Sequence, residues 1–240
     1  MPFNIGGNIY NGGEAKVQDY KNIITRGLLF HMDASTPESY PGSGTVWSDM
    51  GPSGYTGTLT NGPTYSTAGG GTIVFDGTND YVVVPDAAPL RLVGNSTMCL
   101  WVKPTVVKNY GNLIWKANYP SNGYGLISLS NGDVQLQISP SPGPNPAFGA
   151  GTIVNNVWCY LSVTINTSNS VVFYKNGTAT VTTTTSYPVL TGTTTLRIGA
   201  DTDNSRYFNG SMAVVQMYDR VLSAAEVAQN YNIQRNRFGI

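Results

Sequence analysis

The sequence predicts an all-β protein, a sandwich of two antiparallel sheets with one short helix close to the C-terminus. The chain has 240 residues, and its 28 glycines and 14 prolines divide it into short segments, as turns do in β proteins. Segments rich in β-branched and aromatic residues recur at intervals of roughly 8–12 residues. A single stretch, near the C-terminus, has the spacing of apolar residues that is typical of a helix.

Residues 1–27 differ from the rest of the chain because they are polar, rich in Gly and Asn, and show little periodicity. We interpret them as an N-terminal arm that packs on its own domain or on a partner. Residues 28–240 then form one domain, within the size range of all-β sandwiches. The arm makes self-association, or assembly with other proteins, the expected partnership.

Strand-like segments follow each other from residue 28 onward. The run at 96–105 is almost continuously apolar, which predicts a strand buried on both faces. Two Asn-Gly pairs, at 131–132 and 176–177, are typical of hairpin turns. The expected strands lie within residues 28–34, 71–77, 80–86, 96–105, 111–117, 123–130, 132–140, 157–166, 170–177, 178–185, 193–200 and 206–219.

The helix is expected over residues 223–235. Ser223 is a good N-cap, and Glu226 three residues later completes a capping box. One face of the helix is apolar, so the helix should lie on the sandwich. That face consists of Ala224, Val227, Ala228 and Tyr231.

Charged residues are scarce and balanced, with 13 Lys and Arg against 13 Asp and Glu, or 11% of the chain. Without a basic excess we expect no binding of nucleic acid or of anionic membranes. No apolar run reaches the roughly 18 residues of a membrane span, so membrane insertion is not expected. The N-terminus lacks the pattern of a secretory signal, which predicts synthesis and retention in a cytoplasm. A cytoplasmic origin favours buried free thiols over a disulfide for Cys99 and Cys159.

Several motifs, in their order, resemble those of laminin-G-like, concanavalin A-like jelly rolls. The most specific is the closing element FNG…VVQMYDRVLSAAEV, and GLLFHMDAS, IVFDGTNDYVVVPD, STMCLWVKPT, NNVWCYLSVTIN and LRIGAD also match. The resemblance covers about residues 28–232. It implies two curved antiparallel sheets, with binding on the concave face or on the rim loops. Members are mostly carbohydrate- or protein-binding modules, often with one calcium ion, and some relatives of the fold cleave glycans.

A second resemblance concerns the chain as a whole. The short arm, the absent signal and the low-charge composition rich in Thr, Asn and Gly are similar to those of structural proteins of tailed phages. Such proteins also end in a pattern similar to residues 231–239, YNIQRNRFG.

Glycan cleavage is not expected. Glycosidases of this fold need two carboxylates, commonly Glu, held close together on one strand. The sequence has Glu14 in the arm, Glu38 in a loop and Glu226 at the helix N-terminus, and no other glutamate. His31 stands in an alternating strand without a matching Ser or Cys motif, so nucleophilic catalysis lacks a base. We therefore expect a protein that is not an enzyme.

No cofactor is required by the sequence, but the resemblance raises Ca²⁺, which takes roughly six to eight oxygen ligands. The family's ligands come partly from an Asp-x-Ser-Gly-Asn loop, where this chain keeps Asp49 but has Pro52. They also come from an acidic pair in the closing strand, which Met-Ala-Val replaces at 212–214. If Ca²⁺ binds, Asp49 and Asp76 are the expected ligands. The alternative for Asp76 is an Asx-turn.

The segment LIWKANYPSNGYG provides the candidate binding site. Its Trp115, Tyr119, Asn122 and Tyr124 combine aromatic and polar side chains, and we expect them to be exposed as one cluster. The cluster could be a glycan platform, an assembly contact or a set of ordinary surface side chains. Tyr81, at the start of another strand, is expected to face the core.

Taken together, these features favour a non-enzymatic virion structural protein, either a capsid decoration or a fibre-associated subunit. It would act in shell reinforcement or in surface adhesion, through other virion proteins and through glycans of the host surface. The alternative is a free carbohydrate-binding, lectin-like module.

Overall fold

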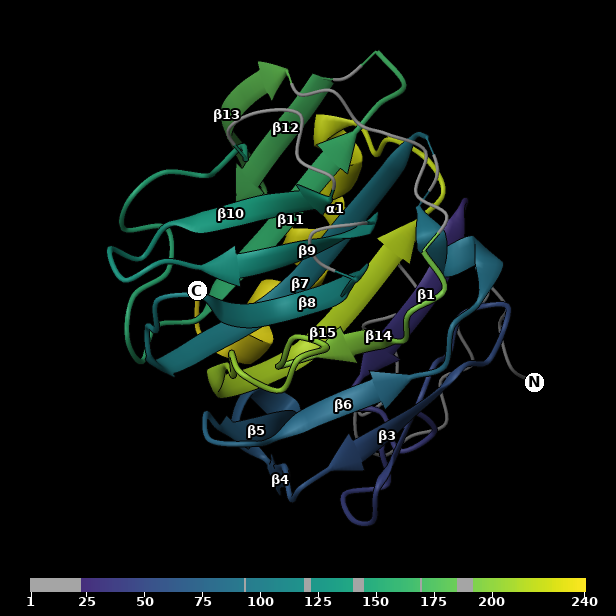
Figure 1. The fold of residues 1–240 in the computed structure, drawn as a ribbon, viewed down its shortest axis with the longest axis vertical. Helices are drawn as coiled ribbons and strands as arrows, with labels where there is room; N and C mark the ends of the chain where they lie inside the picture. The colour runs from purple at the N-terminus through teal and green to yellow at the C-terminus, as the bar shows by residue number, and fades with distance from the viewer. Residues whose placement is uncertain (1–22, 93, 119–121, 140–144, 169, 185–191) are drawn as a thin grey trace, which may run out of the picture.

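The computed structural model describes residues 23–92, 94–118, 122–139, 145–168, 170–184 and 192–240. Within these residues the strands form two antiparallel sheets that face each other (Figure 1). The arrangement confirms the predicted all-β sandwich.

The sheet with eight strands is called sheet A and the sheet with seven strands sheet B. Sheet A has the order β13 (Thr178–Thr184), β12 (Ser170–Lys175), β11 (Cys159–Ile165), β7 (Ser96–Val106), β15 (Asn209–Tyr218), β5 (Thr72–Asp76) and β4 (Thr64–Ser66), with β1 (Leu28–Asp33) also paired to β15. Sheet B has the order β10 (Val134–Ser139), β9 (Asn122–Ser128), β8 (Gly111–Asn118), β14 (Leu196–Ile198), β6 (Tyr81–Val84), β3 (Thr56–Thr60) and β2 (Val46–Ser48). Short 3₁₀ turns lie at Ala68–Gly70 and Ala88–Arg91.

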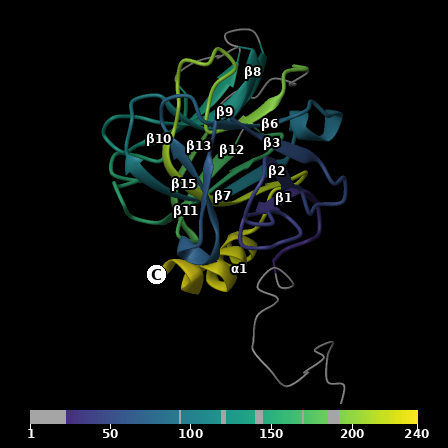
Figure 2. The same cartoon turned by 90° about the horizontal axis from the view of Figure 1, so that it is seen from below.

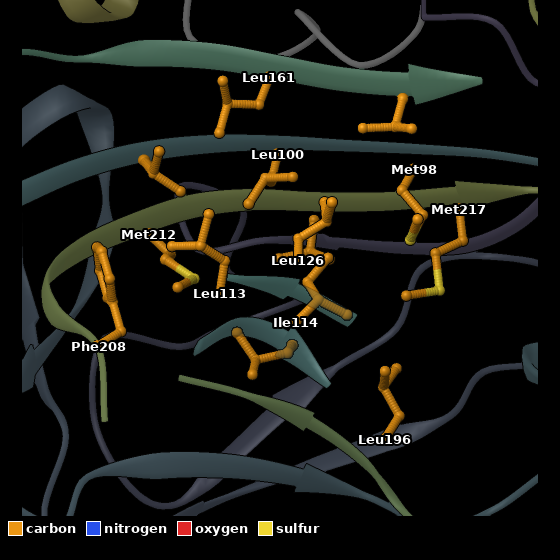
Figure 3. Close-up of a cluster of buried hydrophobic side chains, with 14 of the residues drawn as sticks. Met98, Leu100, Leu113, Ile114, Leu126, Leu161, Leu196, Phe208, Met212 and Met217 are labelled. Atoms are coloured by element: carbon orange, nitrogen blue, oxygen red, sulfur yellow. The ribbon is translucent and has the colours of Figure 1, made fainter. Parts of the chain in front are cut away.

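The main core fills the space between the two sheets. Figure 3 shows side chains of sheet A, such as Met98, Leu100 and Met217, directed toward Leu113 and Leu126 of sheet B. All five are fully buried. The alternation of side chains along each strand places every second residue in this layer.

A second hydrophobic layer lies on the opposite face of sheet A. There Cys99 and Trp101, which alternate with the core residues of β7, pack against Val227 of the C-terminal helix. Figure 2 shows helix α1 (Ala224–Gln234) on the side of sheet A that faces away from sheet B. β7 is therefore buried on both faces, as its continuous apolar run predicts.

Helix α1 begins with the predicted capping box. Ser223 is the N-cap, its Oγ accepts a hydrogen bond from the Glu226 N–H, and the Glu226 carboxylate accepts one from the Ser223 N–H. The helix ends at Gln234 and continues as a 3₁₀ turn over Arg235–Phe238. The expected end at residue 235 is thus correct to within one residue.

The buried face of α1 is more polar than predicted. Ala224 is exposed, whereas Asn230 and Gln234 are buried together with Val227. Burial of these amides is stabilised by hydrogen bonds, since Trp101 Nε1 donates to Gln234 Oε1 at 2.7 Å and Asn230 Nδ2 donates to the Tyr218 hydroxyl at 3.0 Å. The prediction of an entirely apolar buried face was wrong, because polar side chains whose hydrogen-bond partners are fixed can also occupy the buried face of a helix.

The chain enters the domain before residue 28. Ile23 is buried in the second hydrophobic layer, and Ile24 donates its N–H to Asn230 Oδ1 at 2.8 Å. Residues 23–27 of the predicted arm therefore pack on the domain itself. The remainder of the arm, residues 1–22, lies outside the described residues, and its role in assembly stays a prediction.

Both cysteines are buried free thiols, as expected. Cys99 faces the helix side of sheet A and Cys159 faces the main core, so the sheet separates them. Burial raises the pKa of Cys99 to about 11 and that of Cys159 to about 12. Among the helices of the described residues, none is long and apolar enough to span a membrane.

Candidate functional site

The predicted exposed cluster is not formed by Trp115 and Tyr124. Both are buried, at 2% and 1% exposure. In the pairing of β8 with β9, Trp115 stands opposite Gly125 and Tyr124 opposite Lys116. Neighbouring register positions point to opposite faces of a sheet, so these two rings cannot build one platform.

Each of the predicted site residues has a different position. Trp115 lies on the outer face of sheet B and donates from Nε1 to the Ala117 carbonyl at 3.0 Å. Tyr124 turns into the main core, where its hydroxyl donates to the Leu90 carbonyl at 2.7 Å. Asn122 is half-buried and accepts a hydrogen bond from the Gly192 N–H at 2.9 Å. Tyr119 lies outside the described residues.

The two candidate metal ligands are engaged by the backbone. Asp49 is buried and accepts N–H groups of His31 at 2.6 Å, Gly51 at 2.7 Å and Tyr55 at 3.1 Å. Burial nevertheless raises its pKa. Asp76 accepts N–H groups of residues 78 and 79 at 2.7 and 3.3 Å, which confirms the Asx-turn.

These bonds, chiefly the one from residue 78, lower the pKa of Asp76. No group of three or more His, Cys, Asp or Glu side chains that could hold a metal occurs within the described part of the chain. Calcium binding by Asp49 and Asp76 therefore stays a prediction, and neither carboxylate carries the site proposed below.

A different group of side chains meets on the outer face of sheet B. In β14, Leu196 and Ile198 face the core and Arg197 faces outward; in β6, Val82 faces the core and Tyr81 outward. The Arg197 guanidinium lies over the Tyr81 ring, 4.5 Å from its centroid. The expectation that Tyr81 faces the core was wrong, because the alternation of β6 assigns the core positions to Val82 and Val84.

The loop at residues 199–208 completes this group and is fixed at both ends. The Phe208 N–H donates to the Gly199 carbonyl at 2.9 Å, and Ala200 and Tyr207 form a β-bridge. Thr202 Oγ1 donates to the Ala117 carbonyl at 3.0 Å, which attaches the loop to the outer face of β8. The loop is thus held on the rigid sheet, as functional loops commonly are.

Inside the loop, Asp201 acts as the organising residue. Its two carboxylate oxygens accept the N–H of Ser205 at 3.0 Å and the Ser205 hydroxyl at 2.9 Å. Its main-chain carbonyl accepts a hydrogen bond from Arg197 Nη1 at 3.0 Å, and the same Nη1 donates to Asn204 Oδ1. Arg197 is therefore held by the Tyr81 ring and by two neutral oxygen acceptors.

A second arginine–tyrosine contact lies beside the first. The Arg206 guanidinium stands 4.9 Å from the Tyr110 ring centroid, and its Nε is 4.0 Å from Asp201 Oδ2. Tyr207 donates its hydroxyl to the Asn204 carbonyl at 2.9 Å. Its pKa is raised by burial and further by Asp201 and Tyr81 nearby. We call this group the Arg–Tyr cluster: Tyr81, Tyr110, Arg197, Arg206 and Tyr207.

Sheet B, whose strands β6 and β14 carry Tyr81 and Arg197, lies on the side of the sandwich that α1 does not cover (Figures 1 and 2). The Arg–Tyr cluster combines aromatic rings with planar hydrogen-bond donors, and Tyr110 is 43% exposed. The alternation in TLRIG and DYVVV could have identified Arg197 and Tyr81 as outward-facing. Nothing local in the sequence could have placed residues 110, 197 and 206 side by side.

Comparison with known protein families identifies the class. Residues 76–228 match the family model described as the concanavalin A-like lectin/glucanases superfamily. This match covers more than half of the chain, and the protein belongs to that superfamily. No curated protein matches the sequence.

Similar solved structures agree with the fold. Domain 4 of AbnA, an extracellular arabinanase from Geobacillus stearothermophilus in complex with arabinotriose, is 18% identical with a TM-score of 0.68, over 87% of this chain and 100% of that domain. The binding domain of botulinum neurotoxin serotype D is 13% identical with a TM-score of 0.67, over 86% of this chain and 51% of that chain. The binding domain of Paraclostridial Mosquitocidal Protein 1 is 14% identical with a TM-score of 0.67, over 86% and 52%.

The chain therefore spans the whole of the arabinanase domain but only about half of the toxin binding domains. At these identities the likeness shows a shared fold. That fold is one used by domains that bind receptors or glycans.

Proposed function

We propose that this protein is a non-enzymatic, lectin-like module that binds carbohydrate through the Arg–Tyr cluster on the outer face of sheet B. The observation that carries the proposal is the cluster itself. Its guanidinium groups stack on tyrosine rings beside a loop that is bonded at both ends, on the outer face of sheet B.

The chemistry of the cluster suits a sugar. The apolar C–H face of a sugar ring packs on an aromatic side chain, while its hydroxyls need hydrogen-bonding groups of fixed direction. Tyr110 supplies an exposed ring, and Arg197 and Arg206 supply donors held in place by stacking. Few rotamers would have to be ordered on binding, which lowers the entropic cost.

Two similar structures support this choice of ligand. The arabinanase domain was solved with arabinotriose. The binding domain of botulinum neurotoxin DC, 10% identical with a TM-score of 0.66, was solved in complex with SialylT. The arabinanase domain is spanned in full by this chain and is a precedent for sugar recognition on this fold, whereas only 52% of the toxin binding domain is spanned.

Binding without catalysis is part of the proposal. The chain has three glutamates in total, and Glu226 is engaged by Arg220 and by the Ser223 N–H. Within the cluster the carboxylate of Asp201 is bonded to Ser205. A pair of carboxylates across a scissile bond, as glycosidases need, is therefore not expected here. Bound oligosaccharides should be recovered uncleaved after long incubation.

A glycan array followed by calorimetry tests the binding function. We expect glycan binding that falls about tenfold when Tyr110 becomes Ala, the loss expected for one stacking contact of about 1 kcal/mol or slightly more. Arg235→Ala is the control, because Arg235 also lies over a tyrosine, Tyr231, but on the helix side. An array without hits, or equal losses for both variants, would contradict the proposal.

The position of Ile23, the first described residue, favours a display role. Ile23 packs in the layer beneath α1, so the chain enters on the side opposite the Arg–Tyr cluster. We propose that residues 1–22 attach the module to further copies or to other virion proteins, with the glycan-binding face directed outward for adhesion to a host surface. Deleting residues 1–22 should then abolish self-association in light scattering and leave glycan affinity unchanged. A monomer both before and after the deletion would contradict self-association through this segment.

A further inference from the structure

Two arginines of the Arg–Tyr cluster lack the paired hydrogen bonds to one carboxylate that three other arginines of this protein make. Arg91, Arg220 and Arg237 each donate two hydrogen bonds to one carboxylate, of Asp86, Glu226 and Asp33 respectively. Arg197 and Arg206 instead stack on tyrosines.

The donors of Arg197 are only partly used. Its Nη1 donates to two neutral oxygens, the Asp201 carbonyl and the Asn204 amide. Its Nε is buried and donates to no acceptor within the described residues. A buried donor without an acceptor is costly.

The charge of Arg206 is also poorly compensated. Its side chain is 43% exposed, and Asp201 is 4.0 Å away from its Nε. The oxygens of Asp201 already accept hydrogen bonds from Ser205. Arg197 contacts the main-chain carbonyl of the same residue, so both guanidinium groups lie at Asp201.

We infer that the Arg–Tyr cluster selects glycans that carry an anionic group, a carboxylate or a sulfate, with Arg206 as the residue that binds this group. This inference rests on the proposed carbohydrate-binding function and names its ligand class. A planar guanidinium forms paired hydrogen bonds with such oxyanions, and stacking on tyrosine fixes its plane in advance. The neutral part of the sugar would lie against the tyrosine rings.

Calorimetry with matched sugars tests the inference. The probes are trigalacturonic acid, the neutral galactose trimer of the same linkage, a sulfated galactose trimer and arabinotriose. At least one anionic trimer should bind about tenfold more tightly than its neutral counterpart, the gain expected from charge-assisted hydrogen bonds. The preference should shrink as salt is added. Preference for the carboxylated or for the sulfated trimer would identify the natural anionic group.

Three variants assign the effect to Arg206. Arg206→Gln should lower affinity for the anionic trimer about tenfold and affinity for arabinotriose much less, because a neutral sugar loses only an ordinary hydrogen bond to Arg206. Arg206→Lys, which keeps the charge but not the planar fork, should also weaken binding. Arg235→Gln, on the opposite face, should have no effect. Arg206 is exposed, and thermal unfolding would verify that its variants remain folded.

The acidic residue on the same loop gives an independent measurement. Asp203 is exposed, and its carboxylate should repel an anionic ligand, so Asp203→Asn should strengthen binding of the anionic trimer.

The possible failures are distinguishable. Equal binding of neutral and anionic sugars, with the same loss for both in Arg206→Gln, would overturn the anionic preference and leave the proposed function standing. Failure of every sugar to bind would overturn both.

Discussion

The guanidinium of Arg237 forms two hydrogen bonds with the carboxylate of Asp33, at 2.8 and 3.0 Å, across 204 positions of the sequence. Arg237 also donates from Nε to the Gly69 carbonyl at 3.2 Å. Its neighbour Phe238 stacks on Trp101, with 4.0 Å between ring centroids. These contacts fasten the C-terminal turn to the first strand of sheet A and hold α1 over the second hydrophobic layer.

Arg237→Met should therefore destabilise the domain by about 3 kcal/mol, because it leaves the buried carboxylate of Asp33 without its cation. The two side chains are only 10% and 4% exposed, so solvent screening does not reduce the effect much. Urea unfolding measures the change. Arg235→Met, two residues earlier and exposed, should change stability by less than about 0.5 kcal/mol. If Asp33→Asn and Arg237→Met were simply additive, the ion pair would not be the cause.

Acid should destabilise the protein through His31, the neighbour of this pair. Burial lowers the pKa of His31 to about 4 from 6.5; Asp33 raises it and Arg237 lowers it by smaller amounts. Between these values the unfolded chain binds the proton and the folded chain does not, so stability rises with pH. The stability that the neutral, buried His31 contributes is fully present above pH 6.5 and is lost as the pH falls to about 4. The loss in the free energy of unfolding amounts to about 3 kcal/mol.

The measurement is the free energy of unfolding in urea at a series of pH values. His31→Asn should flatten the curve between pH 4 and 6.5, whatever its effect on stability at neutral pH. An unchanged slope in that variant would show that another group titrates in this window.

Much of this fold could be predicted because its signals are local. Alternation of side chains, Asn-Gly turns and the pair Ser223 and Glu226 each depend on a few consecutive residues. The apolar run around Trp101 also predicted that both faces of β7 are buried. The element that covers the second face of β7 is helix α1. Its position can be predicted once the helix is recognised as amphipathic.

The site could not be predicted because it depends on register and on distant contacts. Trp115 and Tyr124 look like one cluster in the sequence, but the pairing of β8 with β9 places them on opposite faces of sheet B. Conversely, Arg206 meets Tyr110 across 96 positions (206 minus 110) through the course of a loop. Neither the burial of Trp115 nor this contact has a local signature.

The two thiols should be inert in the native protein. Cys99 and Cys159 are buried, and burial raises their pKa values to about 11 and 12, so almost no reactive thiolate exists at neutral pH. A chromogenic disulfide reagent should therefore react at the rate of unfolding, and both thiols should react together. Fast reaction of one thiol without denaturant would mean that its strand opens locally.

Gly125→Ala should disturb the outer face of sheet B. A Cβ at this position would overlap with Cε3 of the Trp115 indole and lie 2.9 Å from the Ile114 carbonyl oxygen. Overpacking of this kind costs about 1–3 kcal/mol, which thermal or urea unfolding would detect. Since Trp115 pairs with Arg197 across β8 and β14, displacement of the indole should also weaken glycan binding at the Arg–Tyr cluster.

A second substitution tests the cause. Trp115→Leu creates a void in the wild-type protein and should lower the free energy of unfolding. In the Gly125→Ala background the same change also removes the overlap with the indole, so it should lower the free energy of unfolding by less. The relief will be partial, because the Ile114 carbonyl belongs to the backbone of β8 and cannot move aside. Strict additivity of the two changes would mean that the indole does not fill the space above Gly125.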